Sequence, residues 1–393
     1  MFENLLHQER ITLQLRRDIA AGSLPPALLF TGAPFSGKLT AALETARALC
    51  CRSSGAWNCP CDPCRAHRSL SHPRTLLAGS RDPVPEIAAA AEVLRRRGGD
   101  SSRFLLVRSA RKLLRRFDPV LWEGEERKIL PARGLMERLS EAADDFLPGG
   151  PLPEGDKLEA RLDALVDDCT ALRKYLPGLL PAAQVRHITA WAVHSASGDR
   201  KTVIIDGAER MAEAARNALL KFLEEPPADT TAILIAERRS LLMPTILSRV
   251  RCLAFHRRNP AQEAEVLRRV YHEDENRRGT LADYFRAWRS GPSERMKTMA
   301  SDFIDRARSR DALPPSAVGD IEDASDMRVF LEALGEELRR RRADTEHARA
   351  HKKRGAEAAR LRDARFRAES LNIPVHLVLR GLFSALGGPA APE

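Results

Sequence analysis

The sequence predicts an α/β domain built on a small parallel sheet, followed by regions that contain only helices. Three short apolar segments, at residues 24–32, 201–206 and 231–236, are typical of buried strands, and helical patterns separate them. Such alternation indicates parallel strands joined by right-handed crossovers. After residue 259 only helical patterns remain. Because 393 residues exceed what one hydrophobic core organises, we expect two or three domains.

The composition favours helices over an all-β fold, because charged residues make up 30% of the chain and aromatic residues 5%. The formal net charge of +10 is concentrated, since residues 339–367 hold 12 Lys or Arg against 4 Asp or Glu. That block could contact nucleic-acid phosphates, but with hardly any interleaved aromatic residues a solvated helix face is favoured. No apolar run reaches the roughly 18 to 20 residues that span a bilayer, and the first residues lack the order of a signal peptide. We therefore expect a cytoplasmic protein without membrane contact.

The first strand leads through a glycine turn, GAPFSGK, into a helix from about residue 38 to 50. The turn matches the phosphate-binding pattern G-x-x-x-x-G-K in its required setting, with a strand before and a helix after. Backbone N–H groups of such a loop cradle phosphates, and its lysine reaches the outer ones. A glycine turn without a ligand stays open as the alternative. The candidate nucleotide-binding residues are Gly32, Ser36, Gly37, Lys38 and, at the end of the second strand, Asp206.

Two parts of the machinery for Mg²⁺-dependent hydrolysis are missing around this loop. The residue after the lysine, which holds Mg²⁺ through a hydroxyl in active ATPases, is Leu39, and Thr40 is turned away by about 100°. Asp206 is followed by Gly207 instead of the glutamate that positions the attacking water, and Glu209 lies two positions further on. The sequence therefore predicts that the chain does not hydrolyse ATP, and it leaves the binding of ATP with Mg²⁺ in question.

Five of the seven cysteines lie between residues 50 and 64, which in a reducing compartment indicates a metal site before a disulfide framework. Four thiolates from one short segment suit a tetrahedral structural Zn²⁺ with no position open for catalysis. Free thiols and a disulfide are the alternatives, and Cys51 is an alternative first ligand. The predicted zinc ligands are Cys50, Cys59, Cys61 and Cys64.

Residues 82–181 differ in composition from the rest of the first domain. They contain Arg-rich helical segments, such as residues 108–116, and a Pro/Gly-rich break at residues 147–151. We expect a helical insertion here, because a loop of that length without its own structure is improbable inside a compact domain. The sequence does not reveal what the insertion does.

Two blocks of the sequence resemble the bacterial clamp-loader family, the gamma/tau and delta-prime subunits of DNA polymerase III. The first block runs from residue 7 through the phosphate loop and the cysteines to the Ser-His-Pro at residues 71–73. The second block reads NALLKFLEEPP at residues 217–227 and continues to PTILSRV at residues 244–250. Together they cover under half of the chain, and the insertion has no counterpart in the resemblance.

The resemblance implies an AAA+ P-loop module over residues 1–258, with a zinc module at about 50–64 and the insertion at about 82–181. An all-helical lid at residues 259–312 and an all-helical collar at residues 313–393 would follow. The partners that it implies are the delta and gamma/tau subunits of a hetero-pentameric ring. This ring would open the sliding clamp and set it on primer-template DNA, so that DNA is contacted through the complex.

In that family the arginine of a Ser-Arg-Cys motif reaches ATP that is bound to the neighbouring subunit. Here the motif has Val250 after Arg249, so the resemblance implies that Arg249 acts catalytically in trans. The preceding strand ends in the family on a polar residue that senses the outer phosphate, whereas Glu237 in this chain would repel a phosphate. Together with Leu39 and Gly207, this departure favours the delta-prime type, a subunit without ATPase activity of its own.

Two other functions stay open. An active gamma/tau-like ATPase subunit would need Thr40 to hold Mg²⁺ and Glu209 to place the attacking water, against helix and loop geometry. A zinc-bearing nucleic-acid-binding protein would use the basic block at residues 339–367. It would bind DNA alone with a steep salt dependence, whereas a ring subunit should need its partners.

Overall fold

The structure, a computed structural model, describes residues 1–194, 200–274, 280–288, 294–309, 311–312, 321, 324–343, 350–369 and 373–387. The chain divides into two compact units, Met1–Arg289 and Ser290–Glu393. The domain boundaries expected at residues 258 and 312 stay predictions. The basic block at residues 339–367 lies partly outside the described residues.

A five-stranded sheet in the order β2-β3-β4-β1-β5 forms the centre of the first unit, and all neighbouring strands run parallel. The strands are β1 (Ala27–Thr31), β2 (Thr75–Gly79), β3 (Lys201–Asp206), β4 (Thr230–Ala236) and β5 (Arg251–Ala254). The three predicted strands are confirmed as β1, β3 and β4, and the sheet gains β2 and β5 at its two edges. Asp206 lies in register with Gly79 and Ile235, at the carboxyl end of the sheet, where open α/β sheets place their ligands.

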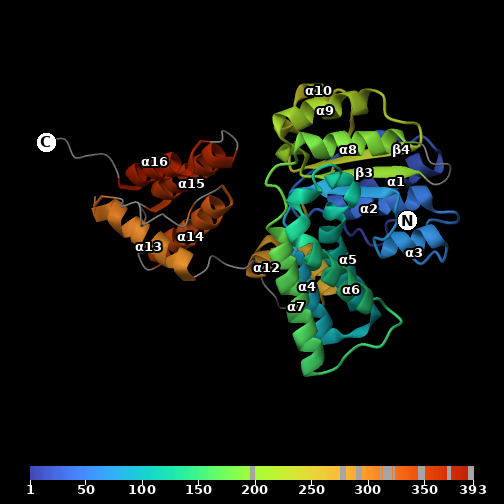
Figure 1. The fold of residues 1–393 in the computed structure, drawn as a ribbon, viewed down its shortest axis with the longest axis horizontal. Helices are drawn as coiled ribbons and strands as arrows, with labels where there is room; N and C mark the ends of the chain where they lie inside the picture. Colours follow the sequence, from blue (N-terminus) through green and yellow to red (C-terminus); the bar gives the residue numbers. More distant parts are fainter. Residues whose placement is uncertain are drawn as a thin grey trace. The chain divides into compact units, whose positions relative to one another are not determined.

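Helices cover both faces of the sheet, because successive side chains of a strand point to opposite sides. The covering helices are α1 (Glu9–Ala20), α2 (Lys38–Cys50), α8 (Ala182–Val193) and α9 (Glu213–Glu224). Leu28 and Phe30 enter the apolar core shared with α1 and α2, whereas Leu29 enters the core shared with α8 and α9. Figure 1 shows these two helix pairs on opposite sides of the strands. The predicted fold class, a parallel sheet flanked by helices with helical regions after it, is confirmed.

Between β2 and α8 the chain is helical. The four helices are α4 (Val84–Arg97), α5 (Gly99–Leu114), α6 (Arg133–Asp145) and α7 (Asp156–Arg173), with short 3-10 turns between α5 and α6. The first of these turns, Arg115–Phe117, packs against the edge strand β2. This contact brings the Arg-rich end of α5 to the sheet.

The rest of the first unit consists of shorter helices, and two of them approach the phosphate loop. These helices are α3 (Asp62–Arg68), α10 (Pro244–Leu247), α11 (Pro260–Tyr271) and α12 (Leu281–Ala287). A separate apolar core joins α4, α11 and α12, and Phe35 of the phosphate loop packs against it. The loop is therefore covered from the side of α12.

The second unit contains helices with their own apolar core, built around Phe303, Phe330 and Leu379. They are α13 (Glu294–Ser309), α14 (Ala324–Ala343), α15 (Ala350–Glu369) and α16 (Val375–Gly387). Among the described residues of either unit, no helix is both long and apolar enough to cross a membrane.

Candidate functional site

The phosphate loop connects β1 to α2 through glycines that the backbone requires. Gly32 has φ +150°, and a Cβ there would lie 2.5 Å from the carbonyl oxygen of Phe255. Gly37 has φ +93° and precedes the first residue of α2, where a Cβ would lie 2.5 Å from a methyl of Leu5. Both positions therefore exclude a side chain, which explains the two glycines of the motif.

Lys38 is folded back onto its own loop. Its Nζ donates to the carbonyl oxygens of Gly32 at 2.5 Å and Ala33 at 2.7 Å, and Ser36 Oγ lies 3.4 Å away. Burial lowers the pKa of this amine to about 8, an effect that the nearby charge of Arg81 strengthens. The lysine is therefore satisfied by groups of the protein, in the place where a phosphate would otherwise receive its hydrogen bonds.

Asp206 forms a buried ion pair with an arginine of the insertion. Arg116 Nη2 lies 3.0 Å from Asp206 Oδ2, and the two side chains are 2% and 4% exposed. Arg81 Nη1 lies 4.0 Å from the same oxygen. Arg116 is anchored further by a hydrogen bond to the carbonyl of Arg81, and its own carbonyl accepts from Trp122 Nε1 at 3.0 Å. The carboxylate expected to orient Mg²⁺ thus has a guanidinium as its counter-ion.

The remaining residues around the loop are also engaged within the chain. Leu39 is buried in the core of α1 and α2, as an apolar side chain should be. The ring of Phe35 stacks on that of Phe285 from α12, with centroids 4.9 Å apart and an angle of 15°. Glu209 Oε1 accepts a long hydrogen bond, 3.4 Å, from the backbone N–H of Glu237, and burial raises the pKa of Glu209. Glu209 therefore has a local contact of its own.

Arg249 is partly exposed and lies in the turn that follows α10, two residues past Leu247. Its Nε and Nη2 donate to Glu224 Oε1 at 2.9 and 2.6 Å, and its Nη1 donates to the carbonyl of Thr245 at 2.7 Å. The side chains of Arg249 and Glu224 are 31% and 48% exposed. The guanidinium is thus accessible from solvent and held by one carboxylate at the end of α9.

Four cysteine thiols, those of Cys51, Cys59, Cys61 and Cys64, come within 4.8 Å of one another. Cys50, the first ligand predicted from the sequence, is outside this group, and its thiol donates to the carbonyl of Arg200 at 3.2 Å. The alternative, Cys51, is in the group because α2 ends at Cys50 and the chain turns to an extended conformation at residue 51. Four thiols at this separation match the ligand set of a tetrahedral structural zinc.

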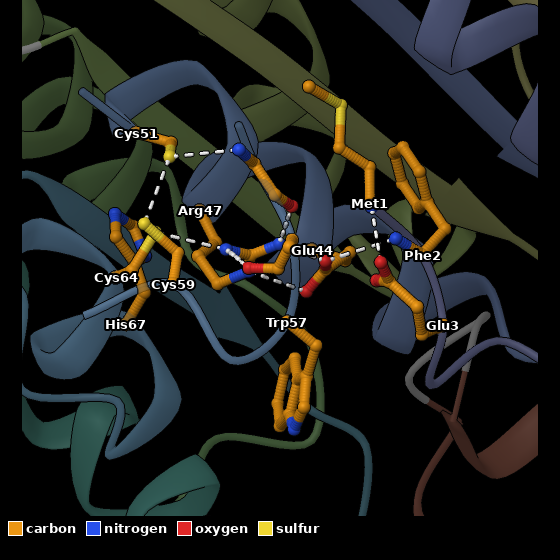
Figure 2. Close-up of polar contacts among 12 residues, drawn as sticks. Met1, Phe2, Glu3, Glu44, Arg47, Cys51, Trp57, Cys59, Cys64 and His67 are labelled. Carbon is orange, nitrogen blue, oxygen red and sulfur yellow. Dashed lines mark hydrogen bonds and ion pairs between the residues drawn. The ribbon is translucent and has the colours of Figure 1, made fainter. Parts of the chain in front are cut away.

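Hydrogen-bond donors lie beside two of the four thiols, those of Cys51 and Cys64. Backbone N–H groups of Ser53 and Gly55 donate to Cys51 Sγ at 3.4 and 3.2 Å. The buried Arg47, itself paired with Glu44, donates to Cys64 Sγ at 2.9 Å, as Figure 2 shows. Such donors orient and stabilise metal-bound thiolates from outside the ligand shell.

A row of arginines on α5 ties the insertion to this cysteine segment. Arg108 donates to the carbonyls of His67 and Arg68 at 3.1 and 2.6 Å, and Arg111 donates to that of Ser69 at 2.6 Å. These carbonyls end helix α3, where the helix dipole favours positive charge. Together with Arg116, this row links the cysteine segment to Asp206. The Arg-rich run is visible in the sequence, but no local pattern identifies its hydrogen-bond partners, which lie some 40 to 90 positions away.

A family described as "DNA polymerase III, delta subunit" matches residues 7–96 and 178–259 of this chain. The matched blocks contain the phosphate loop, the four clustered thiols, Asp206 and Arg249. The two blocks are thus similar to DNA polymerase III subunits of this family. Most of the insertion, including Arg116, lies outside the match.

Curated members of the delta-prime family show the same similarity over short stretches. The DNA polymerase III subunit delta' of Pseudomonas aeruginosa is 49% identical over 67 residues, which is 17% of this chain and 20% of that protein. The subunit delta' of Bacillus subtilis is 43% identical over 75 residues, 19% of this chain and 22% of that protein. This chain thus matches about a fifth of the length of these relatives. A solved structure of a gamma subunit-related protein from Thermotoga maritima aligns with a TM-score of 0.31 at 19% identity, covering 54% of this chain and 80% of that one.

Proposed function

We propose that this chain is a delta-prime-like subunit of a bacterial DNA polymerase III clamp loader that hydrolyses no ATP itself. Its partners would be the delta and gamma/tau subunits of a hetero-pentameric ring, the sliding clamp and, through the complex, primer-template DNA. The observation that carries the absence of hydrolysis is the buried ion pair between Asp206 and Arg116. The family match over the two blocks supports the assignment to the replicase.

The ion pair opposes hydrolysis because phosphoryl transfer in P-loop proteins depends on Mg²⁺ held beside the phosphates. A second cation next to Asp206 would face the charge of Arg116 at a site with little water to screen it. Leu39 contributes no hydroxyl to the metal, and Lys38 already donates to two carbonyls of its loop. Leu39 and the Asp206–Arg116 pair both act against Mg²⁺ binding, and the contacts of Lys38 would have to be exchanged for phosphate oxygens.

Arg249 is the residue that we propose to act on a neighbour's ATP. Its pair with Glu224 is solvent-exposed on both sides and is worth about 0 to 1 kcal/mol. An arginine supplied in trans to a transferred phosphoryl group can be worth 10³ to 10⁵ in rate, or about 4 to 7 kcal/mol of barrier. The pair with Glu224 therefore costs little to break compared with the transition-state stabilisation that an arginine in trans can supply.

We also propose that residues 259–312 form a helical lid domain and residues 313–393 a helical collar domain. A collar of helices would hold the subunit in the ring, and a structural zinc would stiffen the segment that carries the four thiols. Co-purification of the chain with delta and gamma/tau subunits tests the assembly.

The activity claim is tested with the isolated chain. Steady-state phosphate release from ATP should be at background for the wild type and should not change in Lys38→Ala, because no complete site exists to be damaged. Turnover by the wild type that Lys38→Ala abolishes would instead identify an active motor subunit.

A further inference from the structure

A second group of metal-ligating side chains lies beside the four thiols. Cys50, His67 and His72 each offer a ligand atom within 4.8 Å of the other two. All three residues are buried, with exposures of 4%, 3% and 6%. We propose that Cys50, His67 and His72 bind a second zinc ion, distinct from the ion that the four thiols would hold.

The three residues come from separate segments that the fold brings together. Cys50 is the last residue of α2, His67 lies in α3, and His72 precedes β2. The two imidazole rings stack with centroids 4.1 Å apart and an angle of 15°. An ion shared by the three would link α2, α3 and the chain that enters the sheet.

The polar atoms of this group support a bound ion. His67 Nε2 is buried and has no hydrogen-bond partner, which is costly for a polar atom unless something else satisfies it. His72 Nδ1 accepts a hydrogen bond of 3.3 Å from the backbone N–H of Arg74, a long bond that costs little to exchange for a metal. Figure 2 shows the His67 ring beside Cys64 and Cys59 of the four-thiol group.

The chemistry of the donors selects the ion. One sulfur and two imidazole nitrogens suit Zn²⁺, whereas Mg²⁺ and Ca²⁺ prefer oxygen ligands. Binding would release the proton of the Cys50 thiol, which at present donates to the carbonyl of Arg200 at 3.2 Å. That carbonyl, having lost its donor, is then available as a fourth ligand. Because all three side chains are buried, the ion would be structural and would have no route to a substrate.

Nearby arginines oppose a cation, and their partners limit this effect. Arg47 is paired with Glu44, Arg108 donates to the carbonyls of His67 and Arg68, and Arg115 donates to those of His72 and Thr75. Because Glu44 already balances Arg47, the negative charge available to balance the ion is the Cys50 thiolate. A thiolate at Cys50 is therefore essential, and a variant without it should lose the second ion.

The test is the number of zinc ions per full-length chain after equilibration in a zinc buffer, measured by mass spectrometry of the metal. The wild type should hold about two equivalents. Cys50→Ser, His67→Gln and His72→Gln should each hold about one. Cys252→Ser and His187→Gln, which change the same residue types outside both groups, should keep two.

A spectroscopic measurement keeps the proposal testable if a ligand variant fails to fold. Stepwise addition of Co²⁺ to the metal-free wild type should give two sets of bands, a strong thiolate-to-metal set from four sulfurs and a weaker set from one. A wild type that saturates at one equivalent, or a second equivalent that survives in folded Cys50→Ser and His67→Gln, would overturn the proposal. Neither measurement depends on clamp-loader activity.

Discussion

Lys38 of the phosphate loop and Asp206 at the end of β3 are the two charged residues of the predicted nucleotide site, and both are bound to groups of the same chain. Asp206 meets Arg116 and Lys38 meets the carbonyls of its own loop. The identities of these two residues could be predicted from the sequence, but their partners could not. Arg116 is 90 positions from Asp206, and no periodicity or motif connects two residues at that separation. The charge beside Asp206 therefore depends on the insertion, whereas the contacts of Lys38 lie within the motif itself.

The buried pair gives a prediction at this scale. Arg116→Leu leaves Asp206 as a buried charge with only Arg81, 4.0 Å away, and should lower the free energy of unfolding by about 3 to 5 kcal/mol. Adding Asp206→Leu to Arg116→Leu should recover most of this loss, because the uncompensated charge is then gone. Urea denaturation of the single and double variants measures the coupling energy between Arg116 and Asp206.

The control is Arg133→Ala, which removes an arginine from an exposed pair with Glu137. It should change the free energy of unfolding little. A double variant that is as unstable as the sum of the single variants would show that Arg116 and Asp206 do not depend on each other.

At the scale of the elements, the three central strands were predicted and the two edge strands, β2 and β5, were not. β3 spans the predicted residues 201–206, because an uninterrupted apolar run identifies a strand buried on both faces. β5 has four residues, of which two are exposed and one is buried, so its sequence has no such run. The first zinc ligand depends on whether α2 ends at Cys50 or one residue earlier, and sequence patterns do not fix a helix end to one residue.

The cysteine segment gives the prediction that belongs to this scale. Cys61→Ser combined with Cys64→Ser should lose one equivalent of zinc and lower stability, because a structural zinc contributes directly to folding. Metal analysis and thermal unfolding measure the two effects, with Cys252→Ser as the control outside the cluster. A wild-type chain that contains no metal when prepared without chelators would refute the zinc assignment.

At the scale of the whole molecule, the chain combines a family module with helices that the family match leaves out. The matched blocks, residues 7–96 and 178–259, contain all five strands and all the residues of the loop, so the whole sheet lies within the match. The insertion adds Arg116 and the arginine row of α5, which fasten the cysteine segment to the carboxyl end of the sheet. Under the proposed function, Arg249 would act on a neighbour's nucleotide while Asp206 stays paired with Arg116.

The central claim, that Arg249 completes the ATP site of a neighbouring subunit, is tested most directly by single-turnover hydrolysis at that site in the complex reconstituted with its cognate subunits. Arg249→Ala should leave folding, zinc content and assembly unchanged, since its pair with Glu224 is exposed. Hydrolysis at the adjoining site should fall by about 10³ to 10⁵-fold, and Arg249→Lys should recover little, because an ammonium cannot reproduce the planar guanidinium.

Arg251→Ala is the matched control, since Arg251 is an exposed arginine two residues away that pairs with Asp18 at 3.2 Å. The Arg251→Ala complex should hydrolyse ATP at the adjoining site at the wild-type rate. A reconstituted Arg249→Ala complex that does the same would contradict the account, because Arg249 would then be a surface residue without a role in trans.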